Sequence, residues 1–326
     1  MKKRMLGNLE VSAIGLGCMG FSHAYGPAVT EKEAIQKIRE SYDRGYLFFD
    51  TAECYIGQNA DGSISYNEEI VGKALADVRS QVVIATKFGV KHQGDSLLVD
   101  SSPETIYKSV DASLKRLNVD CIDLYYQHRI DPKTEPEEVA NVMADLIKAG
   151  KIRHWGISEA NEEYLRRAHA VYRVTAIENR YSMMARWYES LFPVLEELHI
   201  GFVAFSPMAN GFLTGKYTKD SKFPTGDFRN EMTQYTQEGM AAGAELMKIV
   251  AGLAAEKGVT AAQVSLAWMM NKKPWIVPIP GSRKIERMEE NAKAADVILS
   301  SVEIKKMDHV LSKMDLPVFG GHRVLE

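Results

Sequence analysis

Hydrophobic residues along this chain form two alternating patterns: short continuous apolar runs, and longer segments with apolar residues at helical spacing. The apolar runs predict strands that begin near residues 11, 47, 82, 122, 152, 174, 201 and 275. The amphipathic segments predict helices over residues 30–43, 68–78, 102–116, 136–149, 161–172, 187–198, 241–256, 260–270 and 284–294. Buried strands that alternate with amphipathic helices are typical of a parallel sheet covered by helices.

Eight strand and helix units in 326 residues predict an α/β fold of the (β/α)8 TIM-barrel type, since an open doubly wound sheet usually has five or six strands. The turn signal Gly7-Asn8 within residues 5–10 predicts an N-terminal β-hairpin. The segments 241–256 and 260–270 predict extra helices late in the chain. Length alone fits two ordinary domains or one large one, and the unbroken repeat favours a single domain, residues 1–326.

A glycine motif after the first strand matches the letters GxGxxG of dinucleotide-binding folds over residues 15–20. In that fingerprint a helix begins inside the motif, so that its N-terminus holds the pyrophosphate. Here the first helix signal is the capping box from Thr30 to Glu33. Asp50 also lies well beyond the usual distance of about 20 residues for the ribose-binding acid. We therefore interpret residues 15–20 as a glycine-rich loop.

Charge and composition exclude several classes of partner. The net charge is −3 and like charges form no long run, so nucleic acid is not expected as a partner. No apolar segment approaches the roughly 20 residues that span a bilayer, and residues 1–7 are followed by no apolar signal region, so a soluble, cytoplasmic protein is expected. Cys18, Cys54 and Cys121 lack the spacing of zinc ligands, so no metal is predicted. The oligomeric state cannot be predicted.

Polar residues with useful chemistry follow three consecutive predicted strands. Asp50 and Tyr55 follow the second strand, Lys87 the third and His128 the fourth, and in a barrel the active site lies at these strand ends. An ammonium about 4 Å from a phenol favours the phenolate by about 4 kcal/mol at an effective dielectric of about 20. Lys87 could therefore lower the pKa of Tyr55 before desolvation is subtracted, with Asp50 holding Lys87 in its charged form.

Each of these residues also has a structural interpretation. Lys87 and Asp50 could form an ion pair at the rim of the barrel, His128 could be a hydrogen-bonded core residue, and Tyr55 could close a loop. Their joint position at the ends of adjacent strands favours the catalytic interpretation.

At this point the sequence resembles a known family. The segments Phe49-Asp50-Thr51-Ala52 with Tyr55, 67–72, 86–89, Gln127-His128, 156–159, 205–207, 211–216 and 280–282 are similar to the aldo-keto reductases in order and spacing. The resemblance implies a barrel that binds NADPH across its strand ends and reduces a small-molecule aldehyde or ketone. It also implies that Asp50, Tyr55, Lys87 and His128 form the catalytic tetrad, with Tyr55 as proton donor to the carbonyl oxygen.

The resemblance further implies contacts to the cofactor. Ser158 is expected at the carboxamide, Glu178 stands where many members have Gln, and Phe205 takes the place of the stacking aromatic residue. The remaining expected cofactor contacts are Ser206, Pro207, Met208, Gly211, Leu213, Gly215, Lys216, Gly281, Ser282, Arg283, Arg287, Glu290 and Asn291. Cations near a helix N-terminus oppose the helix dipole and favour a nearby anion, which points to NADP over NAD. A carboxylate at position 178 suggests the hypothesis that Glu178 favours the oxidised ring.

Substrate residues are less well defined. Met19, Phe21, Tyr25, Phe88 and Tyr181 are expected to line an apolar pocket, although any of them could be packing residues. The polar segment 218–238 is long enough to predict a lid over the cofactor. Two other functions stay open at this point: a nicotinamide-binding regulatory subunit with little turnover, and a lyase that forms a Schiff base on Lys87.

Overall fold

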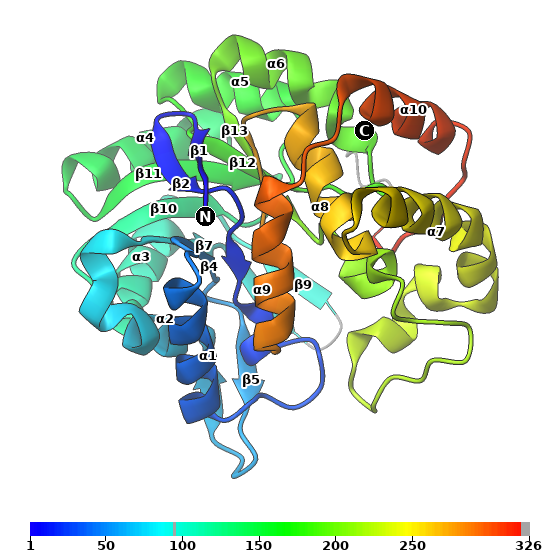
Figure 1. Cartoon of the computed structure of the whole chain (residues 1–326). Coiled ribbons are helices and arrows are strands. Elements are labelled where there is room, and N and C mark those ends of the chain that lie inside the picture. Colours follow the sequence, from blue (N-terminus) through cyan, green and yellow to red (C-terminus); the bar gives the residue numbers. More distant parts are fainter. Residues whose placement is uncertain (94–95, 321–326) are drawn as a thin grey trace.

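Eight parallel strands curl into a barrel with helices around it, as the computed structural model of residues 1–93 and 96–320 shows (Figure 1). Each barrel strand is hydrogen-bonded to the barrel strand that follows it in the chain. In chain order they are β3 (Leu16–Gly17), β4 (Phe48–Asp50), β7 (Val83–Phe88), β10 (Ile122–Gln127), β11 (Ile152–Ser158), β12 (Ala176–Arg180), β13 (Gly201–Phe205) and β14 (Ile276–Pro278). The predicted (β/α)8 barrel is confirmed.

The barrel closes where its first and last strands meet. The Gly15 amide donates to the Pro278 carbonyl at 2.9 Å. A Cβ atom on Gly17 would lie 2.8 Å from the carbonyl oxygen of Ile279, closer than real Cβ atoms approach. A glycine at position 17 is thus required for the approach of β3 to the end of β14. The glycine motif of residues 15–20 therefore allows the barrel to close.

Three antiparallel hairpins stand outside the barrel sheet. They are β1 (Lys3–Leu6) with β2 (Leu9–Ser12), β5 (Ile56–Gln58) with β6 (Ile64–Tyr66), and β8 (Val90–Gln93) with β9 (Ser96–Val99). The first confirms the predicted N-terminal hairpin, and it packs on β13 and β14.

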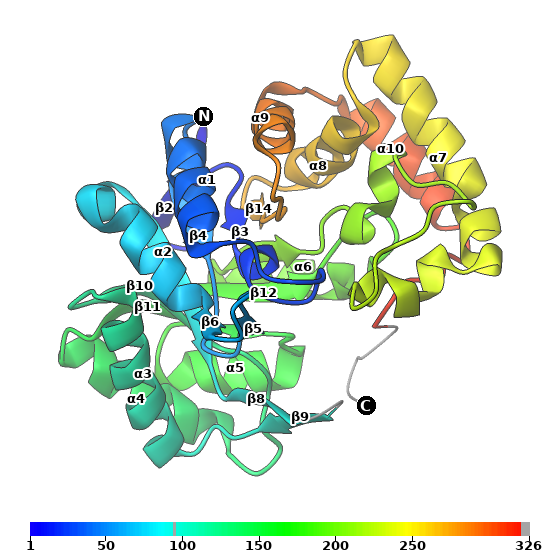
Figure 2. The same ribbon diagram turned by 90° about the horizontal axis from the view of Figure 1, so that it is seen from below.

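Helices surround the barrel, most of them in an outer ring. They are α1 (Glu31–Asp43), α2 (Asn67–Leu75), α3 (Pro103–Leu117), α4 (Pro136–Lys148), α5 (Glu162–Val171), α6 (Phe192–Leu198), α7 (Gln237–Lys257), α8 (Ala261–Lys272), α9 (Ile285–Lys293) and α10 (Ser301–Leu311). Short 3-10 helices span Met19–Phe21, Ala76–Gln81, Trp187–Leu191, Ala209–Thr214, Phe228–Glu231, Thr233–Tyr235 and Ala294–Asp296. Figure 2 shows α7 and α10 packed beside α8, away from the ring helices α1 to α4.

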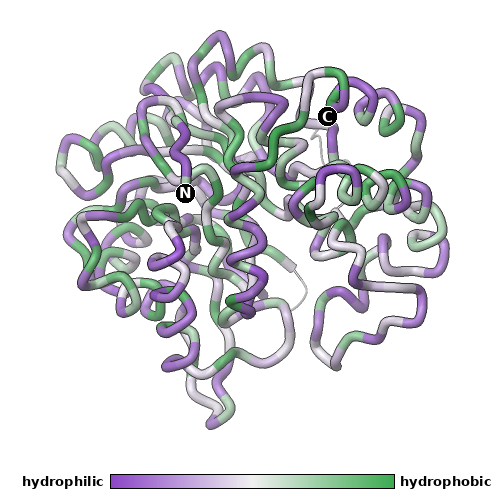
Figure 3. The backbone as a smooth tube through the Cα atoms, in the orientation of Figure 1, coloured by the Kyte–Doolittle hydropathy of each residue, from purple (hydrophilic) through white to green (hydrophobic). Residues whose placement is uncertain are grey.

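Local sequence signals explain several helix boundaries. The Thr30 side chain accepts from the Glu33 amide at the start of α1, and the Ser102 side chain accepts from the Thr105 amide at the start of α3, where Pro103 is the first residue. Asn118 ends α3 in the left-handed conformation, with a φ of 54°. Along the ring helices, hydrophilic and hydrophobic residues alternate (Figure 3), as one buried face requires.

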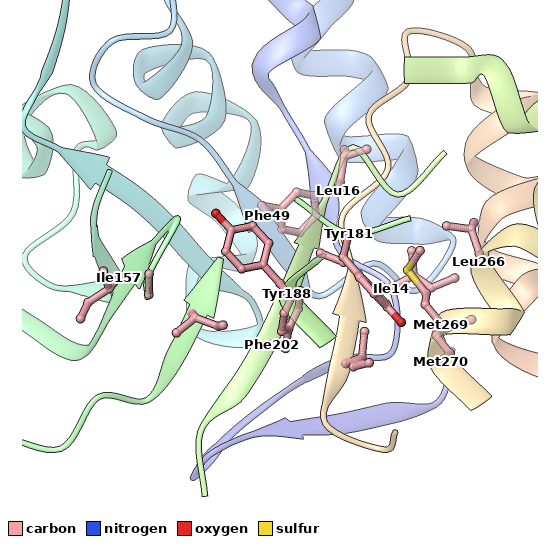
Figure 4. Packing of buried hydrophobic residues seen from close by; sticks show 14 of the residues in the cluster. Ile14, Leu16, Phe49, Ile157, Tyr181, Tyr188, Phe202, Leu266, Met269 and Met270 are labelled. Atoms are coloured by element: carbon pink, nitrogen blue, oxygen red, sulfur yellow. The ribbon is translucent and has the colours of Figure 1, made fainter. Parts of the chain in front are cut away.

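Side chains of the barrel strands alternate between the interior of the barrel and the helices. The interior residues form a compact cluster in which Leu6 and Val11 of the N-terminal hairpin close one end: the strand members are Phe48, Ala85, Leu124, Tyr126, Ala176, Val203, Val277 and Ile279. The outward residues form a larger cluster with the helices, in which Ile14, Phe202 and Met269 pack together (Figure 4). On β4, β7 and β12, the interior position two residues beyond these apolar side chains is occupied by a charged residue.

Some expected elements differ from the structure. The first barrel strand begins at Leu16 rather than near residue 11, because Val11 belongs to the hairpin. The helix expected over residues 187–198 is a 3-10 turn followed by α6, and α7 begins at Gln237, within the segment expected to be polar loop. Helix α10 and the two later hairpins were not expected. Within the described residues, no helix has the length and hydrophobicity needed to cross a membrane.

Candidate active site

Lys87 is the centre of a buried cluster at the C-terminal end of the barrel strands. Its side chain is fully buried, because Lys87 follows the interior residue Ala85 by two positions on β7. Its Nζ atom donates to Asp50 Oδ1 at 2.5 Å and to the Thr51 carbonyl at 2.9 Å. Strands β4 and β7 are adjacent, with Asp50 opposite Ala85. The ion pair is therefore fixed by strand register.

The ammonium of Lys87 stays protonated. Burial lowers the pKa of Lys87, but Asp50, Glu178 and Tyr55 raise it, and the result is a pKa well above the ordinary value. A Schiff-base lyase needs a neutral amine as nucleophile. The geometry therefore argues against the lyase considered from the sequence.

Tyr55 directs its hydroxyl toward this ammonium. The Lys87 Nζ atom lies 3.4 Å from Tyr55 Oη and 5.1 Å from the centre of its ring. The loop that carries Tyr55 is held by its backbone carbonyl, which accepts from Ser22 Oγ and from the Asn67 amide, each at 3.1 Å. Burial raises the pKa of Tyr55, and Lys87 opposes that rise without cancelling it. Tyr55 therefore carries its proton at neutral pH, as a proton donor must.

The His128 ring also borders Tyr55. The two rings meet edge to face, with centres 5.9 Å apart, and the His128 amide donates to the Phe88 carbonyl at 3.0 Å. Burial, followed by the charges of Arg129 and Lys87, lowers the pKa of His128 well below its ordinary value. The imidazole is therefore neutral at physiological pH.

Cys54 contacts one ring nitrogen of His128. Its Sγ atom lies 3.5 Å from His128 Nδ1. Burial raises the pKa of Cys54 to about 12, so the thiol keeps its proton and can donate a hydrogen bond to Nδ1. A neutral imidazole that accepts at Nδ1 carries its hydrogen on Nε2. The structure thus brings together the four residues predicted to be catalytic: Asp50, Tyr55, Lys87 and His128.

Glu178 approaches the same ammonium from β12. It follows the interior residue Ala176 by two positions, and its Oε1 atom lies 3.2 Å from Lys87 Nζ. Glu178 is buried and also contacts the carboxyl group of Asp50. In this arrangement the partners of the Glu178 side chain are Lys87 and Asp50. The expected contact between Glu178 and the cofactor stays a prediction.

Two further predicted nicotinamide contacts lie nearby. Ser158 is buried at the end of β11, where its hydroxyl donates to the Glu178 carbonyl at 2.8 Å and accepts from Arg129 Nη1 at 3.1 Å. Phe205 ends β13 half-buried, and the Arg180 guanidinium lies 5.0 Å from the centre of its ring. Arg180 therefore supports the ring that is expected to stack on the nicotinamide.

The loop after β13 contains most of the residues expected at the pyrophosphate. Positive φ angles are found at Ser206, Ala209, Asn210, Gly211 and Gly215, three of which are not glycine. Such backbone strain gathers at ligand sites, and turns of this kind form anion-binding concavities from backbone N–H groups. Of the other predicted members, Pro207 is buried, Met208 is half-buried and Lys216 is exposed. Leu213 lies in the core, where its amide donates to the Met208 carbonyl and its carbonyl accepts from Ser265 Oγ.

The polar segment 218–238 reaches across to the first loop of the barrel. Tyr25 and Asp227 form an antiparallel bridge, and the Phe228 amide donates to the Ala24 carbonyl at 3.1 Å. Asn210 Nδ2 donates to the Tyr25 hydroxyl at 2.9 Å. The segment therefore joins the first and seventh units of the barrel, and its role as a cofactor lid stays a prediction.

The residues expected at the adenosine end surround the start of α9. Arg283 Nε donates to the Gly20 carbonyl, while Arg283 Nη2 is buried without a hydrogen-bond partner. A buried guanidinium nitrogen without an acceptor fits an anionic group of a nucleotide. The other predicted members are exposed Gly281, half-buried Ser282, buried Asn291, and Arg287, which pairs with Glu290.

Three of the residues expected to line the substrate pocket are buried in the structure. Phe21, Phe88 and Tyr181 expose at most 1% of their surface. Tyr181 donates to Glu189 and stacks on Trp268 with ring centres 5.4 Å apart, inside the outer core (Figure 4). Phe88 packs on Tyr125, because it follows the inward Lys87 and so points outward. Met19 and Tyr25 remain partly exposed.

Two histidines near Tyr55 were missed. The His23 ring stacks on Tyr55 with centres 6.2 Å apart, and the His92 ring lies 4.9 Å from His23. His23 Nδ1 donates to the Ile56 carbonyl at 3.0 Å. His92 belongs to the β8 to β9 hairpin, which the sequence pattern did not indicate, so no sequence signal placed it at the site.

Comparisons with known proteins agree with this geometry. The sequence model of the Aldo/keto reductase family matches residues 13–312. The aldo-keto reductase yakc of Schizosaccharomyces pombe, whose name specifies NADP(+), is 36% identical over 313 residues and is covered over 93% of this chain and 89% of its own.

Two solved structures are also similar. The glycerol dehydrogenase of Gluconobacter oxydans superposes with a TM-score of 0.83 at 27% identity, covering 96% of this chain and 95% of its own. An aldo/keto reductase of Klebsiella pneumoniae in complex with NADP and acetate gives 0.70 at 26% identity, covering 97% and 100%. With the matched family model spanning most of the sequence, this chain belongs to the aldo/keto reductase family.

Proposed function

We propose that this protein is an NADP-dependent reductase of aldehydes and ketones, able in the reverse direction to oxidise the corresponding alcohols. The observation that carries the proposal is the 3.4 Å approach of the Lys87 ammonium to the Tyr55 hydroxyl. A phenol is a poor acid at neutral pH, and an adjacent charged group that favours the phenolate makes it a usable one. The relatives that carry NADP(+) in their name or complex support the choice of cofactor.

In the proposed reaction, bound NADPH supplies a hydride to the carbonyl carbon. Tyr55 gives its hydroxyl proton to the carbonyl oxygen, and Lys87 stabilises the phenolate that results. Asp50 keeps Lys87 charged and in place. His128 donates its Nε2 hydrogen to the same oxygen, which orients the substrate and favours the developing negative charge.

The proposed cofactor contacts follow the length of the molecule. Ser158 and Phe205 hold the nicotinamide end, and the strained loop 206–216 holds the pyrophosphate. Arg283 and Arg287 hold the adenosine end, where the unpartnered Arg283 Nη2 offers a charge-assisted hydrogen bond to phosphate. The two guanidinium groups are the reason to expect NADPH rather than NADH.

The test combines binding with turnover. Fluorescence titration should show tighter binding of NADPH than of NADH, and NADPH oxidation should be observed with members of a panel of aldehydes, ketones and dicarbonyls. Tyr55→Phe should lose turnover while binding NADPH. Tight NADPH binding with no turnover across the panel would support the regulatory-subunit alternative, and absence of nicotinamide binding would contradict both.

A further inference from the structure

The Lys87 ammonium has more acceptors than hydrogens. Two of its three N–H groups are committed to Asp50 and to the Thr51 carbonyl, at 2.5 and 2.9 Å. The third can go to Glu178 Oε1 at 3.2 Å or to Tyr55 Oη at 3.4 Å. Glu178 and the proposed proton donor therefore compete for a single hydrogen.

The charges around Lys87 do not balance unless a proton is added. The Asp50 and Glu178 side chains are each 3% exposed and that of Lys87 is 0% exposed, so two carboxylates and one ammonium would leave a buried net charge of −1. Such a charge is costly in a low-dielectric interior. Asp50 Oδ2 and Glu178 Oε2 are both buried without a hydrogen-bond donor, and the two carboxyl groups are in contact. One proton shared by the two carboxyl groups removes the net charge and supplies the hydrogen-bond donor that the pair lacks.

Lys87 is the cation that contacts Glu178, and Arg129 lies one hydrogen bond further away, on the Ser158 hydroxyl. The groups that face Glu178 are, by element, Asp50 on β4, Tyr55 after β4, Lys87 on β7, Tyr126 on β10, the Ser158 hydroxyl on β11 and the apolar Val203 on β13. Burial raises the pKa of Tyr126 far above its ordinary value, so that phenol stays neutral. The added proton therefore belongs to the pair of carboxyl groups.

We propose that Glu178 carries this proton and directs it toward the Asp50 carboxylate. The ionisation state of Glu178 then decides whether Lys87 donates its third hydrogen to Tyr55 or to Glu178. Glu178 is thus a positioning residue that acts through Lys87. While Glu178 is protonated, the third N–H supports Tyr55 as an acid. When Glu178 loses its proton to water, its carboxylate takes that N–H and repels the phenolate, so carbonyl reduction slows.

This switch falls within an accessible pH range. Burial, followed by the neighbouring Asp50, raises the pKa of Glu178 to about 8, against the opposing effect of Lys87. A glutamine at this position could not ionise. Glu178→Gln therefore holds the site in a form that resembles the protonated state at every pH.

The first experiment rests on the proposed function and compares pH profiles of kcat for carbonyl reduction. In the wild type, kcat should fall by about tenfold for each pH unit above the ionisation of Glu178. In Glu178→Gln this limb should be absent. Glu159→Gln is the matched control, because the Glu159 carboxylate accepts from the Arg180 amide and does not contact Lys87; its profile should follow the wild type. An identical limb in Glu178→Gln would overturn the proposal.

The second experiment needs no turnover. Unfolded Glu178 would ionise near its ordinary pKa of about 4.3, whereas the folded residue holds its proton up to a pKa of about 8. The folded state therefore binds more protons between these values, so the wild type should lose stability relative to Glu178→Gln as the pH rises from about 5 to about 8. A difference in Tm that does not change with pH would overturn the proposal.

The two experiments separate failure of this inference from failure of the proposed function. A pH-dependent Tm difference with no turnover in any variant would uphold the shared proton and contradict the reductase. Should Glu178→Gln not fold, infrared difference spectra of the wild type between about pH 6 and about pH 10 give the same answer, because a protonated carboxyl has its own C=O stretch. Absence of that band at the lower pH would overturn the proposal.

Discussion

The ammonium of Lys87 and the hydroxyl of Tyr55 lie 3.4 Å apart, and each comes from a different unit of the barrel. The lysine is fixed on β7 by Asp50, while the tyrosine is carried by a loop that Ser22 and Asn67 hold from outside the sheet. The proposed acid and the group proposed to strengthen it are therefore positioned by separate parts of the fold, and their roles can be tested separately.

Removing the Tyr55 hydroxyl should abolish the proton transfer and little else. We expect Tyr55→Phe to lower kcat by about 10²- to 10⁴-fold, the usual contribution of a general acid. NADPH affinity and thermal stability should be retained, because the ring and its contacts with His23 and His128 remain. A variant with the turnover of the wild type would show that another group supplies the proton.

Removing the charge of Lys87 should destabilise the whole barrel. Lys87→Met leaves Asp50 and Glu178 as buried carboxyl groups without a cation, and breaking a buried ion pair costs about 3–5 kcal/mol. Urea denaturation near neutral pH measures this loss. The loss should shrink as the pH falls, because protonated carboxyl groups need no counter-ion.

The matched control for Lys87→Met is an exposed lysine of the neighbouring hairpin. Lys91→Met should change the free energy of unfolding by no more than about 0.5 kcal/mol, as is usual for surface substitutions, because Lys91 is exposed on β8. Equal effects of the two substitutions would contradict the buried ion pair.

The three cysteines should differ sharply in reactivity. Cys18 and Cys54 are buried, and burial raises the pKa of both thiols, that of Cys54 to about 12. Cys121 is partly exposed. The thiolate is the reactive form, so a thiol reagent should modify Cys121 in the native protein and the other two only after unfolding. Rapid modification of the native Cys121→Ser variant would contradict this, because it would show that Cys18 or Cys54 is reactive in the folded protein.

Arg283 should contribute to the preference for NADPH. A hydrogen bond to a charged group is worth about 1.5–3 kcal/mol, so Arg283→Ala should weaken NADPH binding by about 10- to 150-fold. Lys293→Ala, in the last turn of α9, is the control and should bind NADPH as the wild type does. An equal loss of NADH affinity in Arg283→Ala would place the guanidinium at the pyrophosphate instead of the 2′-phosphate.

The sequence allowed the barrel and the meeting of Asp50 with Lys87 to be predicted, because parallel strands end at one edge of the sheet. The burial of Phe88 and Tyr181 follows from the period of two along the strands, which the prediction of the substrate pocket did not take into account. Lys87 points inward, so Phe88 points outward; Glu178 points inward, so Tyr181 falls on the outward side. The link from Glu178 to Lys87 joins strands that are not adjacent, and only the closed barrel brings them together.

The cluster around Lys87 draws its members from β4, β7 and β12, which are distant in sequence and meet only inside the finished barrel. A chain interrupted before β12 would lack one of the three charged side chains. Enzymatic activity therefore depends on the whole fold being intact. On heating, loss of activity should coincide with cooperative unfolding rather than precede it.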